Sequence, residues 1–211
     1  MRILIFAFCV CVLLFAACAR KPAENDARTA EYIENYISQL KEIEKVTTRK
    51  FNNVMAFFEN ADENTDDSLL FHLRDAIVES IEANRTAVEE FRALASRPKP
   101  DFVDDTVHIL LRTAASFLGM SYETRITAQT WLNRYISLGT PRFFREYSEG
   151  MEEAMQASRQ AFFFITAARM RQRYLVGDTL DLTQEFLQIP ELPELPESDV
   201  EEGEEEEEEA D

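Results

Sequence analysis

The sequence is poor in cysteine, histidine and glycine, and each shortage narrows what the protein can be. All three cysteines lie among the first 18 residues, so the rest of the chain cannot form a disulfide with itself. The only histidines, His72 and His108, are too few for a many-histidine metal site. Five glycines and seven prolines leave little material for the tight turns of an all-β fold, so the composition favours helix.

Motifs for catalysis and cofactor binding are also missing. The sequence has no His-Glu-x-x-His motif for a metalloprotease, no Cys-x-x-Cys-His motif for covalent haem, no phosphate-binding glycine loop and no Gly-x-Ser-x-Gly elbow. A di-iron bundle needs two Glu-x-x-His units, and the nearest analogue is the single spacing from Asp105 to His108. We therefore predict that the protein is not an enzyme and holds no metal or other cofactor.

Basic residues are absent from the last 21 residues, which carry 13 of the 40 acidic residues. The formal net charge of -18 is concentrated there, and the rest of the chain is only mildly acidic. Nucleic acid is not expected as a partner, because phosphate binding needs a basic surface. The Pro-Glu-Leu repeats and the glutamate run predict a disordered acidic tail over residues 190–211. Such a tail either stays solvated or acts as a polyanion that recruits a basic protein or weakly collects divalent cations.

The one long hydrophobic run lies at the N-terminus, where Arg2 precedes ILIFAFCVCVLLF and the small pair Ala16 and Ala17. This plan is typical of a secretory signal peptide, which we assign to residues 1–17. Counted with the two alanines, the run reaches only the lower edge of the roughly 17 to 25 residues that span a bilayer. An uncleaved membrane anchor is therefore the alternative.

The stretch FAAC, from Phe15 to Cys18, resembles the lipobox of bacterial lipoproteins in the relaxed form of spirochaetes, with Phe15 in place of the usual leucine. The resemblance implies that Cys18 is acylated and becomes the mature N-terminus, with residues 18–25 as a tether. Several acyl chains, palmitate among them, anchor a protein stably, since each buried CH2 contributes about 0.8 kcal/mol. The alternative is that Cys18 is a plain buried thiol. The lipoprotein interpretation places the protein in the cell envelope, with the outer membrane favoured because Ala19 and not aspartate follows the cysteine.

Four segments place apolar residues at steps of three and four, the helical period: residues 26–60, 67–96, 101–138 and 141–175. Polar turn-forming residues separate the first two, and Pro98 and Pro100 end the second. Gly139 suits a left-handed helix end and Pro141 a first helical turn, so the last reversal should be abrupt. Similar lengths and short links predict an all-α fold, an up-down-up-down bundle of four long helices in a domain of residues 26–189.

The last of these segments has two further features. It is rich in small residues between Gly150 and Ala168, which permit close approach of a neighbouring helix. It also contains AFFFITAA, where Phe162, Phe163 and Phe164 make the helix apolar nearly all round, so this region needs cover on more than one side. We predict that residues 178–189 form a short fifth helix over it. The alternative is an exposed docking patch for another protein.

These features together predict a class of function. We interpret the protein as a membrane-anchored helical lipoprotein, held through Cys18, that serves as a structural, scaffold or adaptor component by contacting an unidentified protein. A basic protein is the expected partner of the acidic tail. The alternative hypothesis is a periplasmic carrier that holds an apolar ligand between its helices.

Overall fold

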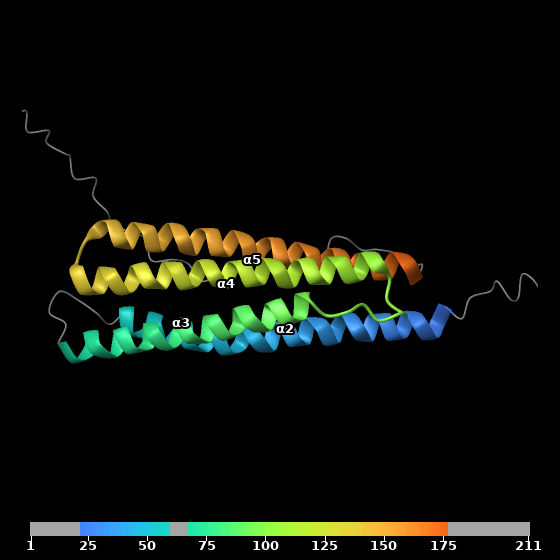
Figure 1. Ribbon diagram of the computed structural model, residues 1–211, viewed down its shortest axis with the longest axis horizontal. Coiled ribbons are helices and arrows are strands. Elements are labelled where there is room, and N and C mark those ends of the chain that lie inside the picture. Colours follow the sequence, from blue (N-terminus) through green and yellow to red (C-terminus); the bar gives the residue numbers. More distant parts are fainter. Residues whose placement is uncertain (1–21, 60–66, 177–211) are drawn as a thin grey trace, which may run out of the picture.

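The computed structural model describes residues 22–59 and 67–176, and every regular element within these ranges is an α-helix (Figure 1). The elements are α2 (Pro22–Glu59), α3 (Asp67–Ala95), α4 (Asp105–Leu138) and α5 (Pro141–Val176). Successive helices run in opposite directions, each packs against the next, and α5 returns to pack on α2. The predicted all-α class with four long packed helices is thereby confirmed. The expected fifth helix (178–189) and acidic tail (190–211) lie outside the described residues.

The helix ends agree with the sequence expectation to within one residue, except at two starts. α2 begins at Pro22, four residues earlier than expected and inside the segment assigned to the tether, because the fixed φ and missing N–H of proline suit a first helical turn. α4 begins at Asp105, four residues later than expected. The Asp104 side chain selects this start, since it accepts hydrogen bonds from the backbone N–H groups of Thr106 and Val107 at 3.1 and 3.2 Å.

The reversal between α4 and α5 is as abrupt as predicted. Gly139 adopts a left-handed conformation with φ 65°, and its N–H donates to the Tyr135 carbonyl at 2.7 Å. A side chain at this position would be strained, which explains the glycine. α5 then begins at Pro141, two residues later, and the two helices form a tight antiparallel hairpin.

Small side chains bring α4 and α5 close together. A Cβ atom placed on Gly150 would lie only 3.0 Å from the Cβ of Ala128, closer than packed carbon atoms normally approach. The Ser121 hydroxyl donates across the seam to the backbone carbonyl of Ala154 at 2.7 Å. The expected close approach of a neighbour to the small residues of α5 is confirmed, and this pair makes the most extensive helix contact in the described fold.

The buried apolar residues form two clusters along the bundle. The cluster at the end where α2 begins contains, among others, Ile33, Tyr36, Leu40, Phe91, Val107, Leu111 and Leu118. The cluster toward the opposite end contains Val54, Leu73, Ile77, Ala128, Leu132, Tyr147 and Met151. Apolar residues at the helical period in the predicted segments, among them Ile37, Leu73, Val107 and Tyr147, are buried, so periodicity identified the inward faces correctly.

A buried polar layer separates the two apolar clusters. The Asn84 side-chain amide donates to Oε1 of Gln129 at 3.1 Å, and the Gln129 amide donates to the Ser80 hydroxyl at 2.9 Å. The Thr47 hydroxyl donates to the Tyr122 hydroxyl at 2.9 Å, which joins α2 to α4 across the bundle. We call these five residues the central polar layer. Their mutual bonds offset the cost of burying polar groups at this level.

Candidate functional site

The three phenylalanines predicted as an interaction surface differ in their surroundings. Phe163 is 54% exposed, whereas Phe162 and Phe164 are half-buried. Phe164 stacks on Phe117 of α4 with ring centroids 5.5 Å apart, and Phe163 meets Phe164 edge-on at 5.6 Å. We call Phe117, Phe163 and Phe164 the phenylalanine patch. Phe164 and Phe117 pack in the seam between α4 and α5, and Phe163 is largely exposed.

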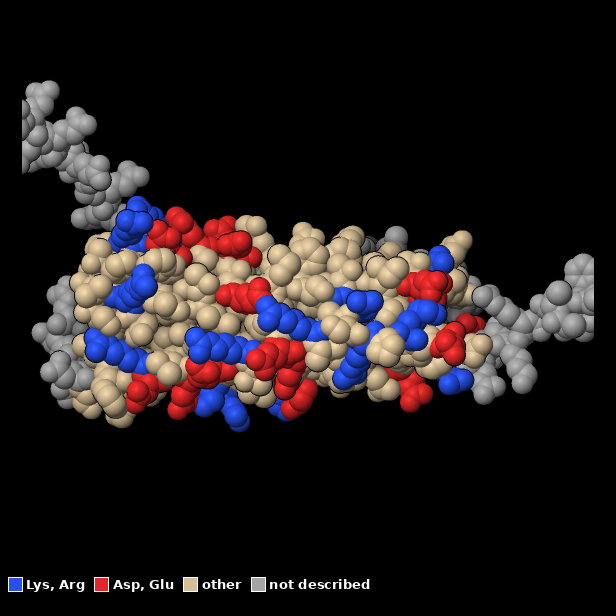
Figure 2. All heavy atoms as spheres, viewed as in Figure 1, with Lys and Arg blue, Asp and Glu red and all other residues tan. Residues whose placement is uncertain are grey.

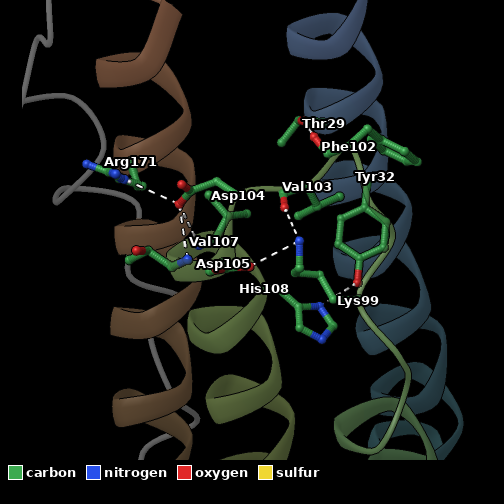
Figure 3. Close-up of polar contacts among 11 residues, drawn as sticks. Thr29, Tyr32, Lys99, Phe102, Val103, Asp104, Asp105, Val107, His108 and Arg171 are labelled. Carbon is green, nitrogen blue, oxygen red and sulfur yellow. Dashed lines mark hydrogen bonds and ion pairs between the residues drawn. The ribbon is translucent and has the colours of Figure 1, made fainter.

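The segment that joins α3 to α4 is fastened along the first turns of α2 (Figure 3). The Thr29 hydroxyl of α2 donates to the Phe102 carbonyl at 3.1 Å, and the guanidinium of Arg28 lies 4.2 Å from the centre of the Phe102 ring. Lys99 Nζ donates to the Val103 carbonyl at 3.0 Å. The buried Val103 side chain extends the apolar cluster beyond the end of α3, the shortest of the four helices.

Asp104 connects this segment to α5. Its carboxylate caps α4 and also accepts a hydrogen bond from Nε of Arg171 at 3.4 Å (Figure 3). Burial favours the protonated acid, but the N–H of Val107 and the Arg171 guanidinium outweigh burial and hold the pKa of Asp104 below its usual value. A single ionised side chain therefore orders the start of α4 and the last turns of α5.

The two histidines lie at opposite ends of the bundle, since α3 and α4 begin at opposite ends (Figure 1). His108 is buried, and its Nδ1 is hydrogen-bonded to the Tyr32 hydroxyl at 3.1 Å. Burial and the nearby Arg112 charge lower the pKa of His108, so its ring is neutral at pH 7. His72 stacks on Phe57 instead. Across the described ranges, no three His, Cys, Asp or Glu side chains gather closely enough to hold a metal ion.

A second pair of opposite charges, Glu44 of α2 and Arg125 of α4, is half-buried near the central polar layer. Burial raises the pKa of Glu44, and the charges of Arg125 and Lys41 oppose this shift without cancelling it. The Arg125 guanidinium lies over the Tyr122 ring at 4.5 Å, and its buried Nε has no hydrogen-bond partner in the described part of the chain. Burying the charged forms of Glu44 and Arg125 therefore lowers the stability of the folded protein.

A groove of about 490 Å³ lies between α2 and α3. Residues of both helices and of the adjoining segment line it: Gln39, Glu42, Ile43, Val46, Thr47, Ala83, Thr86, Ala87, Glu90, Ala93, Leu94 and Arg97. We call this the α2–α3 groove. Ala87 and Leu94 are buried in its floor, and Val46 is 46% exposed at its edge.

Two contacts between α2 and α3 flank the groove, one toward each end of the bundle. Toward the start of α2, the Tyr36 hydroxyl donates to the Leu94 carbonyl at 3.0 Å, which places a large ring between the helices. Toward the other end, Lys50 pairs with Glu79 at 2.6 Å. Between these contacts α3 contributes Ala83, Ala87 and Ala93 to the lining, and these short side chains leave space beside the longer ones.

The charged residues that line the groove are mostly acidic. Glu42 and Glu90 stand on opposite rims, one on each helix, whereas Arg97 is the one basic lining residue and lies where α3 has ended. Glu42 has an exposed ion pair with Lys45 at 3.5 Å. Glu90 has no ion-pair partner among the described residues. Acidic and basic side chains are interspersed over the face drawn in Figure 2, so that face has no broad field of one sign.

Sequence reasoning did not find the groove. Its signal is weak: Ala83 and Ala87 stand one turn apart on the face of α3 that meets α2, a spacing that equally suits close packing. The predicted lipidation site, Cys18, lies outside the described residues. None of the described helices is long and apolar enough to cross a membrane. In comparisons with known proteins, the chain matches no protein-family model, no curated protein and no solved structure.

Proposed function

We propose that the protein is a lipoprotein of the bacterial cell envelope whose helical body acts as a scaffold or adaptor through protein contacts. The observation that carries this proposal is the spacing of the anchor and the body. The lipobox-like cysteine, Cys18, precedes the first residue of α2, Pro22, by only four residues. An acylated Cys18 would therefore attach directly to one end of a packed helical body.

The helical body gives such an anchor a long reach. α2 has 38 residues, which corresponds to about 57 Å at 1.5 Å per residue. Its start, the start of α4 and the end of α5 share one end of the bundle, and the α4–α5 turn lies at the other (Figure 1). The proposed anchor would hold the first end at the membrane, and the rest of the body would remain available for contact with other proteins.

The C-terminal segments fit the same proposal. α5 ends at Val176, 13 residues or about 20 Å beyond Phe163. A fifth helix over residues 178–189 would be about 18 Å long, enough to fold back beside the phenylalanine patch. Residues 190–211 would then extend as an acidic arm that recruits a basic protein, with the outer membrane as the favoured location of the anchored molecule.

A specific observation also supports the carrier hypothesis. The α2–α3 groove has a volume of about 490 Å³, within the roughly 300–1,000 Å³ typical of small-molecule sites, and apolar side chains form its floor. An apolar ligand bound there would make the protein a carrier. Extraction of lipid from the purified protein, identified by mass spectrometry, tests this second function.

Metabolic labelling with a fatty acid tests the anchor. The wild-type chain should incorporate label, and Cys18→Ala should not, because the acyl acceptor is lost. Cys9→Ala and Cys11→Ala are matched controls, since both cysteines lie in the segment that processing would remove. Equal labelling of the wild type and Cys18→Ala would refute the lipoprotein proposal. Crosslinking in cells followed by mass spectrometry would then identify the protein partner.

A further inference from the structure

The α2–α3 groove has a shape that suits an elongated partner. On α2 it extends from Gln39 to Thr47, about 12 Å, and on the other side from Ala83 to the end of α3 at Ala95, about 18 Å, with Arg97 just beyond. These lengths correspond to two to four turns of an α-helix. Ile43, Ala87 and the exposed Val46 offer an apolar floor and edge along this length.

The open side of the groove distinguishes between possible occupants. An alkyl chain laid in a shallow groove would leave one side in water, which costs about 25 cal/mol for each Å² of apolar surface left exposed. An amphipathic helix has a polar face for that side and needs only one apolar stripe buried. Gln39 and Thr86 on the rims can also hydrogen-bond to polar flanking residues.

The charges of the rims indicate the chemistry of that helix. Glu42 and Glu90 would lie on either side of its apolar stripe and attract Lys or Arg side chains there. Arg97 lies at one end of the groove, where a positive charge favours the carbonyl end of a helix. The partner helix would therefore lie with its C-terminus toward Arg97 and its N-terminus toward Thr47.

We propose that the α2–α3 groove binds one amphipathic helix of a partner protein, with an apolar stripe on the groove floor and basic residues paired with Glu42 and Glu90. This deepens the proposed scaffold function, on which it rests, by assigning the contact surface and the class of partner. The acidic tail of this chain is a poor occupant, because its carboxylates would meet those of the rims.

The test uses the full chain in phosphatidylcholine nanodiscs and a labelled 14-residue helical peptide of leucine and lysine, with empty nanodiscs as the blank. Fluorescence anisotropy should show binding. The double variant Glu42→Lys with Glu90→Lys should weaken binding by about tenfold, because two attractive charge pairs become repulsive. Glu152→Lys with Glu153→Lys makes the same change in net charge on exposed positions of α5 and should leave affinity unchanged.

A second variant tests the shape of the site. Ala83→Leu should fill the groove and weaken binding, whereas Ala30→Leu, at an exposed position of α2, should not. Circular dichroism of each variant checks the fold. A nitroxide on the C-terminus of the peptide should broaden NMR signals of residues near Arg97 and not of residues near Thr47, which checks the direction of the helix.

Three outcomes would overturn the proposal. Equal affinity of wild type and the groove charge variant would show that the rims do not select a basic helix. Lipid in the groove, displaced by Ala83→Leu, would identify an apolar ligand as the occupant, and self-association abolished by Ala83→Leu would identify a second copy. Fatty-acid labelling of Cys18 is independent of all three, so loss of the groove contact and loss of the anchor are distinguishable.

Discussion

Single side chains in this bundle hold together segments that are distant in sequence. Asp104 caps α4, accepts from Arg171 of α5 and is ionised because these partners outweigh its burial. Glu44 is the opposite case, a half-buried carboxylate whose neighbouring charges do not offset the loss of water. The two acids have the same chemistry, and their surroundings give them opposite effects on stability.

Asp104→Ala should lower the free energy of unfolding by about 1–2 kcal/mol, since the helix cap and the contact with Arg171 are both lost. Asp104→Asn retains an N-cap and should cost less. The pKa of Asp104 is lowered on folding, so its contribution is present above the unfolded value of 3.8 and disappears as pH falls through the folded value. Urea unfolding at pH 7 and pH 3 measures both effects. If wild type and Asp104→Ala differ in free energy of unfolding by the same amount at pH 3 as at pH 7, the carboxylate charge is not involved.

Glu44→Gln should stabilise the protein at pH 7. Folding raises the pKa of Glu44, so the folded state carries a penalty for the charged form that is present above the folded pKa and relieved as pH falls to the unfolded value of 4.5. The midpoint of thermal unfolding should therefore be higher for the variant at pH 7 and equal to wild type below pH 4. Glu31→Gln, at an exposed position of the same helix, is the control and should change neither.

At the level of the helices, periodicity predicted the buried faces and most ends, but not the distances between neighbours. The α3 alanines that face α2 leave a groove, whereas Ala154 of α5 faces a close seam. The spacing of small residues is the same in both, and the difference depends on distant contacts such as the Tyr36 hydroxyl bond to Leu94. Sequence pattern does not contain those contacts, so the groove and the central polar layer were not predictable from it. The abrupt turn at Gly139 was predictable from the sequence, because it depends only on local backbone geometry.

The bundle should tolerate added volume at Gly119, which faces Phe91 of α3, and not at Gly150, which lies in the seam between α4 and α5. Gly150→Leu should destabilise the protein by about 1–3 kcal/mol, because even its Cβ would crowd Ala128 at 3.0 Å. Gly119→Ala should instead stabilise it by up to about 1 kcal/mol, since the new Cβ meets Phe91 at an ordinary 3.8 Å and helix propensity improves. Denaturant unfolding of both variants measures the difference. Equal effects would contradict the close packing assigned to Gly150.

The central polar layer should be sensitive to partial removal. Gln129→Leu leaves the buried Asn84 and Ser80 without a partner and should cost about 1–3 kcal/mol. The triple variant Ser80→Ala, Asn84→Leu and Gln129→Leu removes all three polar groups and should recover much of that loss, because no buried polar group is then unpaired. A triple variant less stable than Gln129→Leu alone would show that shape, and not hydrogen bonding, dominates at this level.

Over the whole molecule, the described contacts divide into two ends and a middle. The end where α2 begins has the Asp104 and His108 contacts, the middle has the central polar layer and the α2–α3 groove, and the far end has the turn at Gly139. α5 ends beside the start of α2, where the Gln172 side chain donates to the Asp26 carbonyl at 3.0 Å. The last turn of α5 and the first turn of α2, next to the proposed anchor, therefore share one end of the bundle.

A chain that ends at Val176 should be less stable than the full chain if residues 178–189 cover the phenylalanine patch. Phe163 is 54% exposed, and burying the open half of a phenylalanine contributes about 1 kcal/mol. For a body of this size, 1 kcal/mol corresponds to about 2–4 °C in the midpoint of thermal unfolding. A chain that ends at Pro190 retains residues 178–189 and lacks only the acidic tail. Its midpoint of thermal unfolding should equal or slightly exceed that of the full chain. Equal midpoints for the chains ending at Val176 and Pro190 would exclude the covering helix and leave the exposed Phe163 ring available to a partner protein.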